Sequence, residues 1–199
     1  MSDWQVISFF TEGTGYEQEI KKLEASLVRW NVPYHFYACK NFGNWRKNLN
    51  HKSKVIMEAL ETLPEKDIVF LDADAVVNSY PTLFDELSGN GKYDIAFHRF
   101  KQSRIEPKGE LLSGTLWFQN NDMAEYLVDY WHDLALKNPH TRHQKCLDLA
   151  IRQILYMGKH LRIYELPFEY ACIFDHPARK GKAAVIEQFQ ASRRLRNRI

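Results

Sequence analysis

The sequence predicts an α/β domain in which a central, mostly parallel mixed sheet is flanked by helices. Strand-length apolar segments alternate with amphipathic helical segments over roughly the first 70 residues, which is typical of parallel strands joined by helical crossovers. The third strand segment, Asp67 to Leu71, is a nearly unbroken apolar run, as expected of a strand covered on both faces. We therefore expect a Rossmann-like sheet with a ligand site at its carboxyl edge.

Each expected element rests on apolar periodicity and on the turn residues that bound it. The expected strands are 5–10, 32–38, 67–71, 93–98, 111–118, 161–166 and 183–188. The expected helices carry apolar stripes within 20–30, 55–63, 124–135 and 147–155. The chain shows no internal repeat, low-complexity segment or linker, so we expect one domain over 1–191. Residues 192–199 form a basic tail with four arginines and no acid.

Composition limits the classes of protein to consider. The 199 residues contain 27 Lys and Arg against 25 Asp and Glu, which gives no whole-protein argument for nucleic-acid binding. The three cysteines are far apart and lack Cys-x-x-Cys spacing, so we expect neither a disulfide framework nor a zinc site. No signal-peptide pattern opens the chain, and no run approaches about 18 apolar residues. We expect a cytoplasmic protein without a transmembrane segment.

The most informative motif follows the third strand. Asp72, Ala73 and Asp74 place two carboxylates one residue apart at the carboxyl end of a buried strand. Side chains at positions i and i+2 of a strand point the same way, so both acids are expected to reach one ion. Hard cations such as Mn²⁺ or Mg²⁺ take carboxylate oxygens, usually together with substrate phosphates. A solvated surface turn is the alternative, but apolar residues flank the pair on both sides. The sequence therefore predicts a divalent metal at Asp72 and Asp74.

This stretch resembles the Asp-x-Asp motif of GT-A glycosyltransferases, and most closely the family that includes glycogenin and bacterial lipopolysaccharide galactosyltransferases. The resemblance implies a nucleotide-sugar donor, a UDP-sugar by default, and retention at the anomeric carbon. It also implies a basic residue on the preceding helix, for which Lys54 is similarly placed, and a small-residue turn near the sugar at Ser113 and Gly114. It further implies that Gln144, which opens a later helix, lies beside the reacting sugar.

Two positions depart from the family pattern. His143 stands where many members have the Asp of an Asp-Gln pair. A C-terminal His often completes the family's metal site, whereas the corresponding segment here offers Glu187 and Gln188. His176 is the nearest histidine, and we take it as the candidate third ligand.

The remaining candidates follow from position. The loop after the first strand contains Thr11, Gly13 and Thr14, whose hydroxyls and flexible backbone suit contact with a nucleotide. A plain turn is an equally good interpretation of this loop. Lys54 would neutralise a diphosphate, or would simply be solvated. An inverting enzyme would need a carboxylate base, and Asp148 and Glu110 are the candidates.

The predicted function is sugar transfer from a nucleoside diphosphate to the hydroxyl of an acceptor that the sequence does not identify. A sugar-phosphate nucleotidyltransferase is the first alternative, but the loop after the first strand lacks the basic residues expected there. A non-catalytic nucleotide- or nucleic-acid-binding module that uses the arginine tail is the second.

Overall fold

The computed structural model describes residues 3–100, 109–176, 181 and 183–195. Its helices and strands follow one another in this order: β1 (Trp4–Thr11), α1 (Tyr16–Arg29), β2 (Tyr34–Cys39), α2 (Trp45–Asn48), α3 (His51–Thr62), β3 (Asp67–Leu71), β4 (Ala75–Val77), α4 (Thr82–Ser88), β5 (Ile95–Phe100), β6 (Glu110–Phe118), α5 (Asp122–Lys137), α6 (His143–Tyr156), β7 (Ile163–Glu165), η1 (Phe168–Tyr170), β8 (Cys172–Ile173), β9 (Ile186–Gln188) and α7 (Ser192–Leu195). Within the described residues, no helix is long and apolar enough to cross a membrane.

The six-stranded sheet has the order β2-β1-β3-β6-β5-β7. Strand β6 runs antiparallel to both of its neighbours, and the other pairs are parallel. This confirms the expected mostly parallel mixed sheet. A smaller sheet of order β4-β9-β8 joins the segment after β3 to the C-terminal part of the chain.

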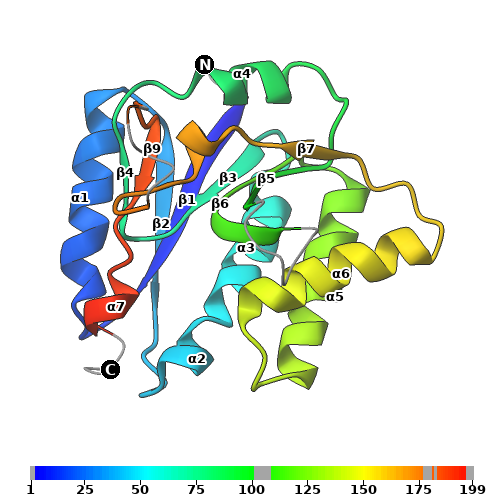
Figure 1. The fold of residues 1–199 in the computed structure, drawn as a ribbon, viewed down its shortest axis with the longest axis horizontal. Helices are drawn as coiled ribbons and strands as arrows, with labels where there is room; N and C mark the ends of the chain where they lie inside the picture. Colours follow the sequence, from blue (N-terminus) through cyan, green and yellow to red (C-terminus); the bar gives the residue numbers. More distant parts are fainter. Residues whose placement is uncertain (1–2, 101–108, 177–180, 182, 196–199) are drawn as a thin grey trace.

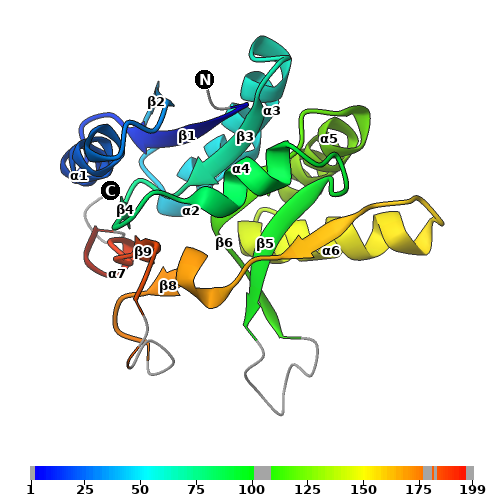
Figure 2. The same cartoon turned by 90° about the horizontal axis from the view of Figure 1, so that it is seen from above.

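Helices cover both faces of the large sheet (Figures 1 and 2). Strand β3 shows why, because its five residues are all buried and alternate between two cores. Ile68 and Phe70 pack with α3, α5 and α6, while Val69 and Leu71 pack with α1 and α4. Burial on both faces explains the unbroken apolar run in the sequence.

The sequence prediction missed the shorter elements. It placed no element at β4, α2, α4, η1 or β8, which have between two and seven residues. Such segments are too short for periodicity to identify. Within the expected basic tail, residues 192–195 form α7 beside α1 (Figure 1). Residues 196–199 lie outside the described residues.

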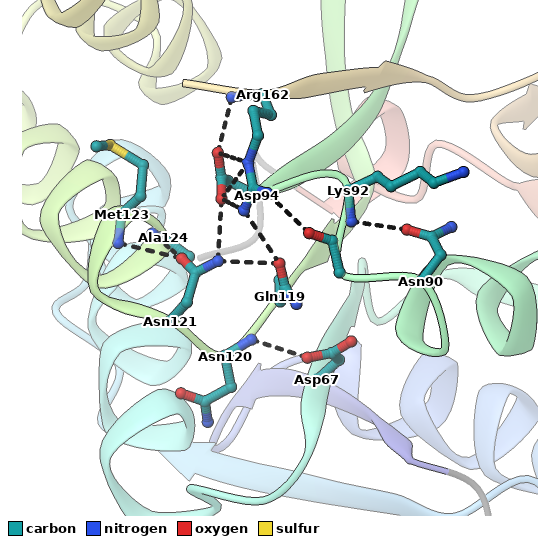
Figure 3. Close-up of polar contacts among 11 residues, drawn as sticks. Asp67, Asn90, Lys92, Asp94, Gln119, Asn120, Asn121, Met123, Ala124 and Arg162 are labelled. Atoms are coloured by element: carbon teal, nitrogen blue, oxygen red, sulfur yellow. Dashed lines mark hydrogen bonds and ion pairs between the residues drawn. The ribbon is translucent and has the colours of Figure 1, made fainter. Parts of the chain in front are cut away.

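Asp94, a buried carboxylate at the amino end of β5, forms an ion pair with the partly exposed Arg162 (Figure 3). Its carboxylate is 1% exposed and accepts hydrogen bonds from the Arg162 backbone N–H at 2.7 Å and from Asn121 Nδ2 at 2.9 Å. Arg162 Nη2 lies 2.5 Å from Asp94 Oδ1. Strand β5 runs parallel to β3, so this cluster lies at the edge of the sheet opposite Asp72.

We expect Asp94→Ala to lower the free energy of unfolding by about 2 kcal/mol, because N–H groups of Asn121 and Arg162 lose the charged acceptor that they share. Burial alone would raise the pKa of Asp94, but the hydrogen bonds from Arg162 and Asn121 outweigh it and hold the pKa below its ordinary value. The pair therefore stabilises the fold above the unfolded-state pKa of about 4 and loses this effect as the pH falls through the lower folded-state pKa. Urea denaturation should show a large gap between wild type and variant at pH 7 that narrows below pH 4. A gap that does not change with pH would contradict this account.

Candidate active site

The two carboxylates of the Asp-x-Asp motif lie just beyond β3. Asp72 and Asp74 stand in a turn closed by the Ala75 backbone N–H, which donates to Asp72 O at 2.9 Å. They are therefore not both on one strand, as the sequence analysis assumed. The Asp72 side chain is 36% exposed, whereas Asp74 is 9% exposed and accepts a short hydrogen bond from the Ala191 backbone N–H. Burial and the neighbouring charge of Asp72 raise the pKa of Asp74 to about 6, so the two acids interact.

A buried lysine holds the first carboxylate. Lys52, the second residue of α3, places Nζ 2.7 Å from Asp72 Oδ1 and donates to Ser113 O at 3.0 Å. Its side chain is 5% exposed. Lys54, the lysine that the sequence analysis chose, lies on the exposed face of the same helix, and its role at a diphosphate stays a prediction. Two residues along a helix correspond to a rotation of about 200°, so the two lysines cannot face the same site.

Strand β6 brings its small residues to the carboxylates. Leu71 pairs with Thr115, and the Asp72 backbone N–H donates to Gly114 O at 2.9 Å. Ser113 and Gly114 therefore lie beside Asp72, as expected. A Cβ built on Gly114 would lie 3.2 Å from Asp72 Oδ2, so glycine at this position leaves room for that carboxylate.

Gln144 is fixed next to the same strand. Its Oε1 accepts from the backbone N–H and the hydroxyl of Ser113, each at 3.3 Å, and its Nε2 donates to Glu110 Oε1 at 3.0 Å. The structure thus joins Gln144 to Ser113 and, through Ser113, to Lys52.

Asp148, one turn further along α6, has different partners. Its carboxylate lies 2.9 Å from Arg99 Nη2 and 2.5 Å from Arg152 Nη2. Among the described residues, the structure shows no contact between Asp148 and the carboxylates of Asp72 and Asp74.

His143 links the helices that carry the site. Its ring is buried, and its Nε2 lies 3.3 Å from Ser53 Oγ, which in turn lies 2.9 Å from His132 Nδ1. Burial holds the pKa of His143 well below its ordinary value, so the ring is neutral. Because Ser53 follows Lys52 and His143 precedes Gln144, this contact ties the starts of α3 and α6 together. The Asp expected from the family is thus replaced by a structural histidine.

The loop after β1 uses its hydroxyls internally. Thr14 Oγ1 donates to Thr11 O at 2.7 Å and lies 3.1 Å from Thr11 Oγ1, while Gly13 adopts a positive φ of 69°. Tyr16 follows this loop. Burial raises the pKa of its hydroxyl, the charges of Asp74 and Asp72 add to the rise, and a hydrogen bond with Trp45 opposes it. The Tyr16 hydroxyl is therefore close enough to the carboxylates to be affected by their charge, and sequence reasoning did not identify this residue.

His176 does not join the carboxylates. Its ring lies 4.2 Å from that of Phe100 and 6.2 Å from that of Phe168, in an aromatic cluster beyond β5. Among the residues that the structure describes, no group of three His, Cys, Asp or Glu side chains is arranged to hold a metal. The structure thus shows His176 in aromatic packing and shows no contact between it and Asp72 or Asp74 among the described residues, so its expected role as third metal ligand stays a prediction.

The C-terminal segment lies over the site. Phe189 N–H donates to Asp74 O at 3.1 Å, and Gln188 Nε2 donates to Gly114 O at 2.9 Å. A pocket of about 270 Å³ lies beside Asp74, lined by Glu19, Lys22, Asp74, Ala75, Val76, Phe174, Phe189 and Arg194. Residues from both ends of the chain thus surround the second carboxylate.

Solved glycosyltransferases share this fold. A glycosyltransferase involved in the glycosylation of the major capsid of PBCV-1 is 16% identical, with a TM-score of 0.71, and the match covers 96% of each chain. Mouse xyloside xylosyltransferase 1 is 11% identical, with a TM-score of 0.56, and the match covers 95% of this chain and 98% of that one. GlyE of Streptococcus pneumoniae TIGR4 is 16% identical with a TM-score of 0.60, and the match covers 95% of this chain but only 55% of GlyE.

These likenesses confirm the expected fold, which is that of GT-A-type glycosyltransferases. No protein-family model matches the chain, and no curated protein matches it in sequence. The chemistry of this chain therefore rests on its own residues.

Proposed function

We propose that this protein transfers a sugar from a nucleoside diphosphate sugar, a UDP-sugar by default, to an acceptor hydroxyl. The observation that carries the proposal is the group formed by Asp72, Asp74 and Lys52 at the carboxyl end of β3. Two negative charges and one positive charge lie close together there. The fold that carries them is shared by solved glycosyltransferases. A diphosphate with a divalent cation matches that combination.

The two carboxylates suit a divalent cation of the Mn²⁺ or Mg²⁺ type. Their oxygens are the hard donors that these ions prefer, and Asp72 is partly open to solvent. When bound, the cation would neutralise negative charge on the departing diphosphate. Asp72 and Asp74 are the residues that would hold it.

The surrounding side chains prepare the site for charge that develops on the leaving group. Lys52 supplies a fixed positive charge that is shielded from water, and such preorganised charges are worth most where water is excluded. Ser113 and Gly114 lie between these groups and Gln144, where we place the sugar. Gln144, held by Ser113 and Glu110, presents a neutral amide there.

This arrangement favours retention over inversion. Inversion needs a carboxylate that is free to accept the acceptor proton. Asp148 is engaged by Arg99 and Arg152, and Glu110 accepts from Gln144. Gln144 is thus the side chain that we place beside the reacting sugar, as the family resemblance implies.

Calorimetric titration of a panel of nucleoside diphosphates, with and without Mn²⁺, tests the proposal. We expect one nucleotide to bind measurably and to bind at least tenfold more tightly when Mn²⁺ is present. A sugar screen with that base would then identify the donor. Folded protein that binds no nucleotide under either condition would refute the transferase assignment, and metal-independent binding alone would favour a binding module.

A further inference from the structure

The Gln188 amide at the end of β9 has a fixed orientation. Its Nε2 donates to Gly114 O at 2.9 Å and contacts Thr115 Oγ1 at 3.0 Å. A backbone carbonyl only accepts hydrogen bonds, so the nitrogen must face Gly114 and Oε1 must face the other way. The hydrogen bond to Gly114 O therefore identifies which atom of the Gln188 amide is the nitrogen and which is the oxygen.

The amide oxygen has no hydrogen-bond partner among the described residues, although Gln188 is only 3% exposed. Leaving a buried acceptor unpaired destabilises a folded protein, so such a group calls for an explanation. A ligand that binds this oxygen in the working enzyme would provide one.

Gln188 Oε1 faces the space that Asp72 also faces. A Cβ built on Gly114 would lie 3.1 Å from Gln188 Oε1 and 3.2 Å from Asp72 Oδ2. Gln188 also pairs with Ala75, the residue after Asp74, where β4 meets β9. The amide oxygen therefore lies near the Asp72 carboxylate, and the backbone of Gln188 pairs with the residue that follows Asp74.

We propose that Gln188 Oε1 is the third protein oxygen that binds the divalent cation held by Asp72 and Asp74. This inference rests on the proposed function. Amide oxygens are hard ligands that suit Mn²⁺ and Mg²⁺. Two carboxylates and a neutral amide balance the charge of a divalent ion, and the diphosphate and water supply the remaining oxygens.

Mn²⁺ binding measured by electron paramagnetic resonance, with Mn²⁺ alone and with Mn²⁺ plus UDP, tests this role without relying on catalysis. We expect Gln188→Ala to weaken Mn²⁺ binding at least tenfold. Gln188→Cys should shift the preference from Mn²⁺ toward Cd²⁺ at least tenfold, because a thiolate selects softer metals. A purely structural glutamine would not produce that shift. Glu187→Gln, a neutral substitution at the adjacent residue of β9, should change Mn²⁺ affinity by less than twofold.

The outcomes separate this inference from the proposed function. Wild-type Mn²⁺ binding that depends on Asp72 and Asp74 but is unchanged in both Gln188 variants would overturn the third ligand alone. Wild-type protein that takes up no Mn²⁺, with or without UDP, would overturn the metal site and this inference together. If Gln188→Ala does not fold, the metal preference of Gln188→Cys decides the question.

Discussion

Replacing Asp72 and Asp74 together by asparagine is expected to lower kcat/KM for sugar transfer about a thousandfold, which corresponds to roughly 4 kcal/mol of transition-state stabilisation. The double variant removes both negative charges that would hold the cation, while the amide oxygens keep the shape of the site. Stabilisation of the leaving diphosphate would then depend on Lys52 alone. Initial-rate kinetics with the donor identified by titration would measure the loss, and Mn²⁺ should no longer stimulate the residual rate.

Replacing Asp74 should raise the stability of the fold although it lowers activity. The folded-state pKa of Asp74 lies near 6, above the unfolded-state value of about 4. The unfolded state therefore ionises first, and the free energy of unfolding falls as the pH rises from about 4 to about 6. Asp74→Asn removes that charge and keeps an oxygen that can accept from the Ala191 N–H. We expect the free energy of unfolding at pH 7.5, without metal, to rise by on the order of 1 kcal/mol.

Loss of activity together with loss of stability would mean that Asp74 is a structural residue, and the assignment of the site would have to be revised. Equal stimulation by Mn²⁺ in wild type and double variant would place the metal elsewhere. Thermal melting with and without Mn²⁺ distinguishes these cases, because a specific site stabilises the wild type only when the metal is present.

The sheet and the Asp-x-Asp motif could be predicted because their signals are local. The strand Asp67–Leu71 was predicted with the bounds that the structure shows, since five consecutive buried residues leave an unbroken pattern. Strand-length and helix-length segments also alternate in the order that the fold requires. Local patterns therefore sufficed to place Asp72 at the carboxyl end of β3.

The contact between Lys52 and Asp72 was not predicted, because a family position was given more weight than helical phase. Lys52 lies three and four residues before Val55 and Ile56, which puts it on the buried stripe of α3. The sequence alone therefore shows Lys52 as a charged residue on an apolar stripe, which could have identified it as a candidate. Lys54 lies off that stripe and is exposed.

The contacts of Gln188 could not be read from the sequence. Its partner Gly114 is 74 residues away and is reached only because β6 inserts antiparallel beside β3 and β9 returns beside β4. Neither the register nor the small sheet has a local signature. The surroundings of His176 could not be predicted for a related reason, since its aromatic neighbour Phe100 comes from a distant strand.

Lys52→Met and Lys54→Met form a matched pair that tests which lysine serves the site. Methionine keeps the length of the lysine stem and removes the charge. We expect Lys52→Met to weaken nucleoside diphosphate binding about a hundredfold, or roughly 3 kcal/mol, because it removes a buried charge beside Asp72. Lys54→Met should change the affinity by less than twofold, since an exposed charge is screened by water and salt.

Mn²⁺ affinity gives the pair a second, opposite readout. Lys52 Nζ lies 2.7 Å from Asp72 Oδ1, so its positive charge competes with a cation for that carboxylate. Without nucleotide, Lys52→Met should therefore bind Mn²⁺ more tightly than wild type, while it binds the diphosphate more weakly. Damage to the fold would weaken both ligands, and a lysine with no role at the site would change neither. Only a lysine that faces the metal and the phosphates together moves the two affinities apart, and calorimetry on the same protein preparation measures both.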